Sequence, residues 1–280
     1  MPTLDFMQVD VFSKVPFKGN PLAVVIRADS LTDSDMAAFA AWTNLSETVF
    51  LLQPSVAGAD YRLRIFTPAA ELPFAGHPTL GACHVWLAAG GKPQGEEVVQ
   101  ECLAGLVRIR RDGARLAFAA PPLVRTGPVQ PDVIARIAAG LRIAPESIRA
   151  SQWVDNGPGW VAVKLGSRRE VLALRPDMAA LKGIKVGVVA PWEPAQDGPD
   201  AQFEVRAFVP DLGIPEDPVT GSLNAGLAQW LIGSGQAPGD YVAAQGTALN
   251  RAGRVHVRQA GPDIWIGGDT TVCIKGTVSL

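Results

Sequence analysis

The fold is decided by residues 77–90, which read HPTLGACHVWLAAG. Apolar and small side chains surround most of this stretch, and a pair of glycines, Gly90 and Gly91, ends it. A helix that is apolar on nearly every side has to be covered on nearly every side. The stretch therefore predicts a helix over residues 77–90 that is buried within its own domain.

A second part of the chain repeats the order of elements around this helix. In the first half, a strand ending in residues 64–68 (RIFTP) leads through a loop to the helix that carries Trp86-Leu87. In the second half, a strand ending in residues 206–210 (RAFVP) leads through a loop to another apolar helix, predicted over residues 222–232. The shared order of strand, loop and buried helix indicates an internal repeat.

This repeat predicts an α+β fold with two pseudo-symmetric domains. The expected boundaries are 1–124, with the first helix at 77–90, and 125–280, with the second at 222–232; the last strand is a candidate to return to the first domain. The 29 glycines and 23 prolines favour many tight turns between strands. Two such halves can face each other across a cleft. Each helix N-terminus would then offer backbone N–H groups to a small carboxylate.

The remaining segments give weaker signals. A helix from Leu31 to about Thr43 is expected, with Thr32 as its N-cap. The other expectations are a connector over 121–131, a helix over Asp132–Leu141, a loop over 210–220, and three short strands over Gly253–Leu280.

Composition excludes several classes of protein. The net charge is −2, with no run of Lys and Arg interleaved with aromatic residues, so neither nucleic acid nor a membrane surface is an expected partner. No apolar run approaches the roughly 18 residues needed to span a bilayer, and the first five residues do not begin a secretory signal. The three widely spaced cysteines fit a reducing cytoplasm.

Short motifs occur in a fixed order along the chain: 9–12 (VDVF), 17–25 (FKGNPLAVV), 46–48 (SET), 66–68 (FTP), 76–79 (GHPT) and 217–222 (DPVTGS). Together they resemble the PhzF-like family of phenazine biosynthesis, over essentially the whole chain. The resemblance implies the diaminopimelate epimerase-like fold, in which each domain is a curved, mostly antiparallel sheet around a central helix. It also implies a homodimer, no metal or organic cofactor, and an isomerase that moves a proton on a small carboxylate substrate.

The resemblance assigns the proton-carrying role to Glu47, with His77, Asp217 and Ser222 around the substrate. A lone glutamate is usually a surface charge, but its flanking Ser46 and Thr48 match the family motif. An apolar, closed cleft would raise the pKa of Glu47 towards working pH. Three further interpretations concern the ligand itself. Asp217 would orient an amine or a hydroxyl, His77 would hydrogen-bond the substrate and hold a transferred proton, and Ser222 with the N–H groups near Gly76 and Gly221 would hold the carboxylate.

Each of these residues also has a structural interpretation. His77 and His84 could form a metal pair, although no Asp, Glu or Cys completes a ligand set nearby. Asp217 before a proline is ordinary turn chemistry, and Ser222 could be an N-cap. Asn20 is as well explained by a turn as by a substrate contact. Two weaker candidates are the segment 156–160, a turn by default, and Arg206 with Glu216, which could pair or be solvated.

Two alternative functions stay open. A two-base epimerase or racemase would use Glu47 and Asp217 on opposite faces of one carbon. A non-catalytic protein would keep the fold and bind a small molecule. A racemase with two thiols is disfavoured, because Cys83, Cys102 and Cys273 fall within a predicted helix and strands, where they are best explained as small core residues.

Overall fold

The computed structural model describes residues 2–211 and 214–280, and it divides into two compact units. Unit 1 comprises Met1–Ala119 and Gly267–Leu280, and unit 2 comprises Ala120–Ile266. The chain thus passes from unit 1 to unit 2 after Ala119, ahead of the predicted boundary at 124–125, and the last strand belongs to unit 1. Residues 212 and 213, within the loop predicted over 210–220, lie outside the described residues.

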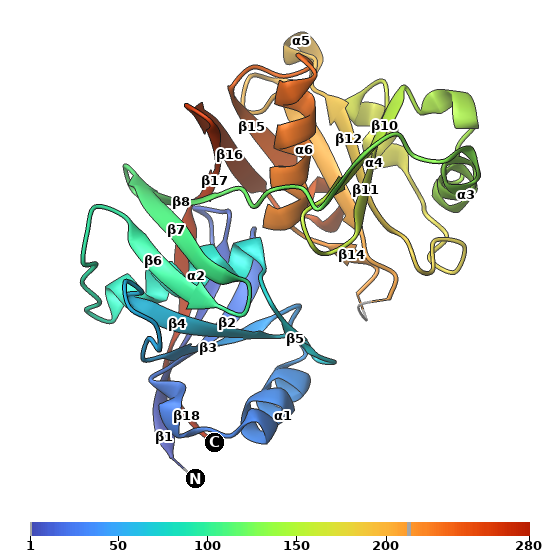
Figure 1. The fold of residues 1–280 in the computed structure, drawn as a ribbon. Helices are drawn as coiled ribbons and strands as arrows, with labels where there is room; N and C mark the ends of the chain where they lie inside the picture. Colours follow the sequence, from blue (N-terminus) through green and yellow to red (C-terminus); the bar gives the residue numbers. More distant parts are fainter. Residues whose placement is uncertain (1, 212–213) are drawn as a thin grey trace. The chain divides into compact units, whose positions relative to one another are not determined.

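Unit 1 is a mixed sheet with two helices and one 3₁₀ turn (Figure 1). Strands β18, β1 and β2 pair antiparallel, β2–β3 parallel, β3–β4 antiparallel, β4–β6 parallel, and β6, β7 and β8 antiparallel, while β5 pairs with β4. The bounds are β1 (Thr3–Val11), β2 (Asn20–Ile26), η1 (Ala28–Ser30), α1 (Asp33–Thr43), β3 (Thr48–Leu52), β4 (Tyr61–Phe66), β5 (Glu71–Leu72), α2 (Gly76–Ala88), β6 (Val98–Cys102), β7 (Gly105–Asp112), β8 (Arg115–Ala119) and β18 (Thr270–Ser279).

Unit 2 follows the same plan. Strand β9 pairs antiparallel with β10, β10–β11 are antiparallel, β11–β12 parallel, β12–β13 antiparallel, β13–β15 parallel and β15–β16 antiparallel, while β14 pairs with β13. The bounds are β9 (Arg125–Gly127), α3 (Pro131–Leu141), η2 (Pro145–Ser147), β10 (Ala150–Asp155), β11 (Trp160–Lys164), α4 (Arg168–Ala173), β12 (Lys185–Pro191), α5 (Pro194–Asp197), β13 (Phe203–Phe208), β14 (Glu216–Asp217), α6 (Gly221–Gly233), β15 (Asp240–Gln245), η3 (Thr247–Leu249), β16 (Gly253–Ala260) and β17 (Asp263–Gly268), whose last two residues belong to unit 1.

Strand register aligns the two repeats just before each central helix, although the preceding turn is three residues longer in unit 2. Phe66 pairs with Glu71 in unit 1, and Phe208 pairs with Glu216 in unit 2. The next residues, Leu72 and Asp217, are therefore equivalent. Each central helix begins four residues later, so that His77 and Ser222 are equivalent second residues of α2 and α6. The predicted α+β fold with two pseudo-symmetric domains is confirmed.

The same ion pair fixes this loop in both units. Arg64 donates from Nε and Nη2 to the two carboxylate oxygens of Glu71, at 2.8 and 2.7 Å. Arg206 does the same to Glu216, at 2.9 and 2.7 Å, and its Nη1 also donates to the backbone carbonyls at the end of α4. Bidentate pairs combine charge with fixed geometry. Of the two open interpretations for Arg206 and Glu216, pairing is correct.

The central helices are buried by the strands of their own units. Helix α2 contacts β1, β2, β3, β4, β6, β8 and β18, and α6 contacts β10, β11 and β16 (Figure 1). Small residues allow the close approach. A Cβ on Gly81 would lie 2.5 Å from a methyl carbon of Leu22, and one on Gly226 would lie 2.3 Å from the carbonyl oxygen of Val154. The expectation of two helices covered on nearly every side is correct.

Element ends differ from the predictions in places. Helix α2 runs over Gly76–Ala88 and not 77–90, because Gly90 takes a positive φ of 96° and turns the chain. Helix α6 runs over Gly221–Gly233 and not 222–232. Thr32 is the predicted N-cap, in a capping box with Asp35.

Several elements were not foreseen, among them β5, β14, α5 and β15. The connector predicted over 121–131 contains strand β9, and α4 was not predicted. A six-residue helix is too short for a periodic apolar pattern to mark it. The strands predicted over Gly253–Leu280 are present, but β18 is ten residues long and not short.

We expect Gly226→Ala to lower the free energy of unfolding by about 1–3 kcal/mol, because the added methyl group would force α6 away from the Val154 carbonyl. Urea denaturation followed by circular dichroism measures this change. Gly233→Ala is the matched control on the same helix, where no heavy atom lies within 4 Å of the added Cβ. Equal effects of the two substitutions would contradict the close packing.

Candidate active site

In unit 1, three of the predicted residues meet at the start of α2. His77 is the second residue of this helix, Glu47 directly precedes β3, and Asn20 begins β2. Nε2 of His77 lies 3.5 Å from Oε2 of Glu47, and the two side chains are 4% and 14% exposed. Nδ2 of Asn20 lies 3.3 Å from Nδ1 of His77. An acid, an imidazole and an amide are thus brought together from three separate segments.

The imidazole of His77 is neutral at neutral pH. Burial lowers its pKa to about 3, and a hydrogen bond to the Pro21 backbone opposes this shift only in part. The contact with Glu47 therefore joins a neutral ring to a carboxyl group and is not an ion pair between two charges. A neutral imidazole can donate or accept a hydrogen bond, but here it is a poor store for an extra proton.

In unit 2, the predicted residues Asp217, Gly221 and Ser222 lie at the start of α6. The Thr220 hydroxyl donates to Oδ2 of Asp217 at 2.6 Å. Gln245, on β15, donates from Nε2 to the Asp217 carbonyl at 3.1 Å and to the Thr220 hydroxyl at 2.9 Å, while its Oε1 accepts from the Thr220 N–H at 3.0 Å. These bonds fix the loop that carries Asp217 to the first turn of α6.

Ser222 is held from the β10–β11 hairpin. Nε1 of Trp160 donates to the Ser222 hydroxyl oxygen at 3.0 Å, and Nδ2 of Asn156 donates to the Ser222 carbonyl at 2.9 Å. The hairpin turn is itself stiffened by Asp155, whose Oδ1 accepts the N–H groups of Gly157 and Gly159. The segment 156–160 is a turn, as predicted by default, and it also contacts a predicted site residue. Ser222 makes no side-chain cap, since the N-cap residue is Thr220.

Sequence reasoning missed Gln245 and gave Trp160 no partner. Both reach the helix start from strands that are distant in the sequence, so no local motif could join them to it. One signal was available for Gln245, which is a lone amide in an otherwise apolar strand end and is fully buried. A buried amide needs partners, and this one has them.

The two helix starts differ as anion receptors. The first backbone N–H groups of a helix have no acceptor within it, and they favour negative charge. In α6 these residues are Gly221, Ser222 and Leu223, since Asn224 already donates to the Thr220 carbonyl. In α2 the third position is Pro78, which has no N–H. The α6 start therefore offers one more backbone donor than the α2 start.

The cysteine thiols are not activated as bases. Burial raises the pKa of Cys83 to about 12 and is also the largest cause of the raised pKa values of Cys102 and Cys273. A thiol acts as a base only through its thiolate. This supports the expectation that a two-thiol racemase is disfavoured.

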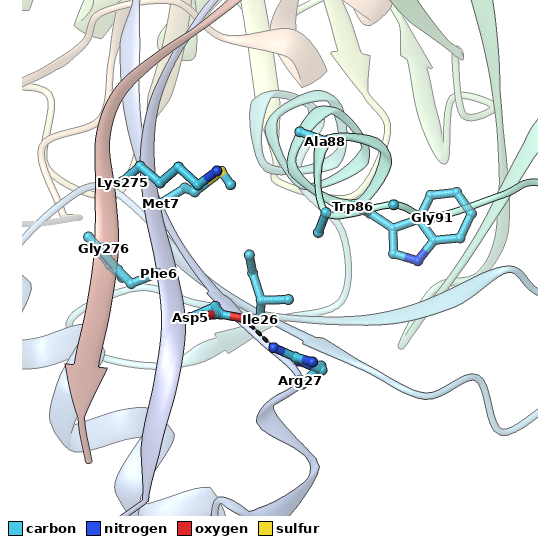
Figure 2. A pocket seen from close by; sticks show the side chains of 12 residues that line it. Asp5, Phe6, Met7, Ile26, Arg27, Trp86, Ala88, Gly91, Lys275 and Gly276 are labelled. Atoms are coloured by element: carbon cyan, nitrogen blue, oxygen red, sulfur yellow. Dashed lines mark hydrogen bonds and ion pairs between the residues drawn. The ribbon is translucent and has the colours of Figure 1, made fainter.

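A pocket of about 580 Å³ in unit 1 lies at the other end of α2 (Figure 2). It is lined by the end of the helix, from Trp86 to Gly91, and by β1, β2 and β18, with Arg27 paired to Asp5 and Lys275 beside Met7. The first helix residue that lines it, Trp86, is nine residues from His77 along α2, or roughly 14 Å. This pocket contains none of the predicted site residues.

Residues 2–211 and 214–280 contain neither a metal-ligand group nor a membrane-spanning helix. No three His, Cys, Asp or Glu side chains in that part of the chain are grouped as metal ligands. No helix there has the length and apolar character to cross a bilayer.

Several proteins that are similar to this chain over most of its length are named as isomerases. "Trans-2,3-dihydro-3-hydroxyanthranilate isomerase" of Pseudomonas aeruginosa is 34% identical over 265 residues, covering 91% of this chain and 90% of that protein. "Uncharacterized isomerase PM1503" of Pasteurella multocida is 32% identical over 263 residues, covering 93% and 89%. "Antisense-enhancing sequence 1" of Schizosaccharomyces pombe is 36% identical over 97% of both proteins. The protein is an isomerase.

A family model described as "Phenazine biosynthesis-like protein" matches residues 9–277. A crystal structure from Enterococcus faecalis, of the PhzF family, covers 100% of both chains with a TM-score of 0.81 and 27% identity. A hydroxyproline epimerase from Agrobacterium vitis shares the fold alone, with a TM-score of 0.58 and 16% identity. The chain belongs to the phenazine biosynthesis-like PhzF family.

We expect acid to destabilise the fold through His77. Between pH 6.5 and about 3 the unfolded ring binds a proton and the folded ring does not, so stability falls as pH falls. The slope from this residue reaches about 1.4 kcal/mol per pH unit. Urea denaturation from pH 8 to pH 4 should show a shallower loss for His77→Gln than for the wild type. Parallel curves for the two proteins would show that the folded ring takes up its proton near the ordinary pKa.

Proposed function

We propose that this protein is a cofactor-independent isomerase that moves a proton between two carbons of a small carboxylate substrate, with Glu47 as the single acid/base. The observation that carries the proposal is the contact of Glu47 with His77 at the start of α2. A general base must lie within reach of the proton that it takes, on a rigid support. Glu47 stands between the end of α1 and the buried strand β3, which provides that support.

The neutral state of His77 supports Glu47 as the proton carrier in this proposal. Because burial lowers its pKa to about 3, a cationic imidazolium is disfavoured, and the proton is better held by a carboxyl group. Glu47 therefore takes the proton from one carbon and returns it to another. His77 acts as a neutral hydrogen-bonding group that orients Glu47 or the substrate, and Asn20 orients His77.

Unit 2 supplies the anion-binding groups in this proposal. The substrate carboxylate is bound by the first N–H groups of α6 and by the Ser222 hydroxyl, with Gly221 letting the backbone approach the ligand. Asp217 orients an amine or a hydroxyl of the substrate. Preorganised donors of this kind stabilise the negative charge that develops when a carbon loses its proton.

The first candidate substrate is trans-2,3-dihydro-3-hydroxyanthranilate, because a relative at 34% identity is named as its isomerase. Related proteins named only as uncharacterised isomerases leave other small carboxylates as candidates. We also infer a homodimer, from the resemblance to the family, and a cytoplasmic location, from three free cysteines.

Glu47→Gln is expected to lower turnover by about 10²–10⁴-fold, since the amide cannot carry a proton while the shape is kept. Proton NMR in heavy water with trans-2,3-dihydro-3-hydroxyanthranilate follows both conversion and the entry of deuterium at a ring carbon. Glu96→Gln, at an exposed position of the same unit, is the matched control and should behave as wild type.

The same experiment separates the alternatives. Conversion by wild type with a shifted double bond and loss in Glu47→Gln would support the proposal. Inversion at one carbon, with loss in both Glu47→Gln and Asp217→Asn, would instead support a two-base epimerase. Full activity in Glu47→Gln would rule out its role as the acid/base.

A further inference from the structure

The β10–β11 hairpin places two polar groups with unused hydrogen-bonding capacity beside the start of α6. The indole N–H of Trp160 is a donor only, so its 3.0 Å bond occupies a lone pair of the Ser222 oxygen and leaves the Ser222 proton to be donated elsewhere. Among the described residues, no acceptor for that proton is present. Ser222 is therefore set to act as a donor to a ligand.

The second group is the amide oxygen of Asn156. Its Nδ2 donates to the Ser222 carbonyl at 2.9 Å, which fixes the amide orientation, because a flipped amide would place oxygen against oxygen. Oδ1 of Asn156 is buried and has no hydrogen-bond partner, on a residue that is 9% exposed. A buried acceptor without a donor costs free energy, and a ligand that supplies the donor recovers it.

These two groups are complementary, and their residues are joined by the bond from Asn156 Nδ2 to the Ser222 carbonyl. Ser222 offers a donor, which suits a carboxylate oxygen, and Asn156 offers an acceptor, which suits an N–H or O–H. A carboxylate with an amine or a hydroxyl on a neighbouring carbon supplies a partner for each of them. Backbone N–H groups at the α6 start add to the carboxylate side of this arrangement.

We propose that Asn156 is a specificity-determining residue, whose Oδ1 accepts a hydrogen bond from an amine or hydroxyl next to the substrate carboxylate bound at Ser222. This inference rests on the proposed function, in that it assumes a carboxylate at the α6 start. Among small carboxylates, Asn156 thereby selects those that carry an N–H or O–H donor on the carbon next to the carboxylate. A site built to receive a donor rejects the analogue that lacks one, because its own acceptor is then left buried without a partner.

The test is calorimetric binding of benzoate, 2-aminobenzoate and 3-aminobenzoate to the wild-type protein and to Asn156→Leu. Wild type should bind 2-aminobenzoate about 10-fold more tightly than the other two, the ratio expected for one hydrogen bond to a buried acceptor. In Asn156→Leu this preference should fall to about 1. Thermal denaturation shows whether Asn156→Leu is folded. If it is not, the comparison of the three ligands on the wild-type protein still tests the proposal.

Asn224→Leu is the matched control. Asn224 lies in the first turns of the same helix, and its Oδ1 is also buried without a partner, but the residue is 0% exposed and its Nδ2 is held by Thr220 and Gln245. Its substitution should leave the preference for 2-aminobenzoate unchanged.

The outcomes separate the two claims. Equal binding of benzoate and 2-aminobenzoate to wild type overturns the role of Asn156 while the carboxylate site stands. A preference that survives in Asn156→Leu, or that is lost equally in Asn224→Leu, also overturns that role. No binding of any of the three ligands overturns the carboxylate site at the α6 start, and the inference with it.

Discussion

The burial of one helix inside the sheet of each unit is the constraint on which the other features depend. Because α2 and α6 are apolar on nearly all sides, strands must cover them, and glycines such as Gly81 and Gly226 let the backbones approach. The polar groups of a buried helix are its first N–H and last C=O groups. The candidate site residues accordingly gather at the two helix starts, where the Arg64–Glu71 and Arg206–Glu216 pairs fix the preceding loops.

The two units share a scaffold but differ in the side chains at equivalent positions. His77 is replaced by Ser222, Leu72 by Asp217, and Pro78, which has no N–H, by Leu223. In the proposed function, this difference gives the two units separate chemical roles. Unit 1 carries the acid/base, with a neutral imidazole against it, and unit 2 carries the donors for an anion. A repeat thus keeps the geometry of a helix start while its chemistry changes, because the fold depends on the apolar faces and not on these few polar residues.

Much of this could be predicted from the sequence, because the repeat and the apolar helices are local patterns. The N-cap at Thr32 and the strand that follows Glu47 are local as well. What could not be predicted depends on contacts between distant segments. Trp160 and Gln245 reach α6 from strands whose sequences do not indicate this contact, and the neutral state of His77 follows from complete burial. Helix α4 could not be predicted because six residues are too few to show a periodic apolar pattern.

The central claim is that one carboxyl group, Glu47, both removes the proton and returns it. It is tested most directly with trans-2,3-dihydro-3-hydroxyanthranilate that carries deuterium at the carbon from which the proton leaves, converted in light water. A single base sheltered from solvent predicts that part of the product keeps deuterium at the new carbon, and that Glu47→Gln forms no such product. Complete loss of the label during wild-type turnover, with product formed at the normal rate, would contradict direct return by one base.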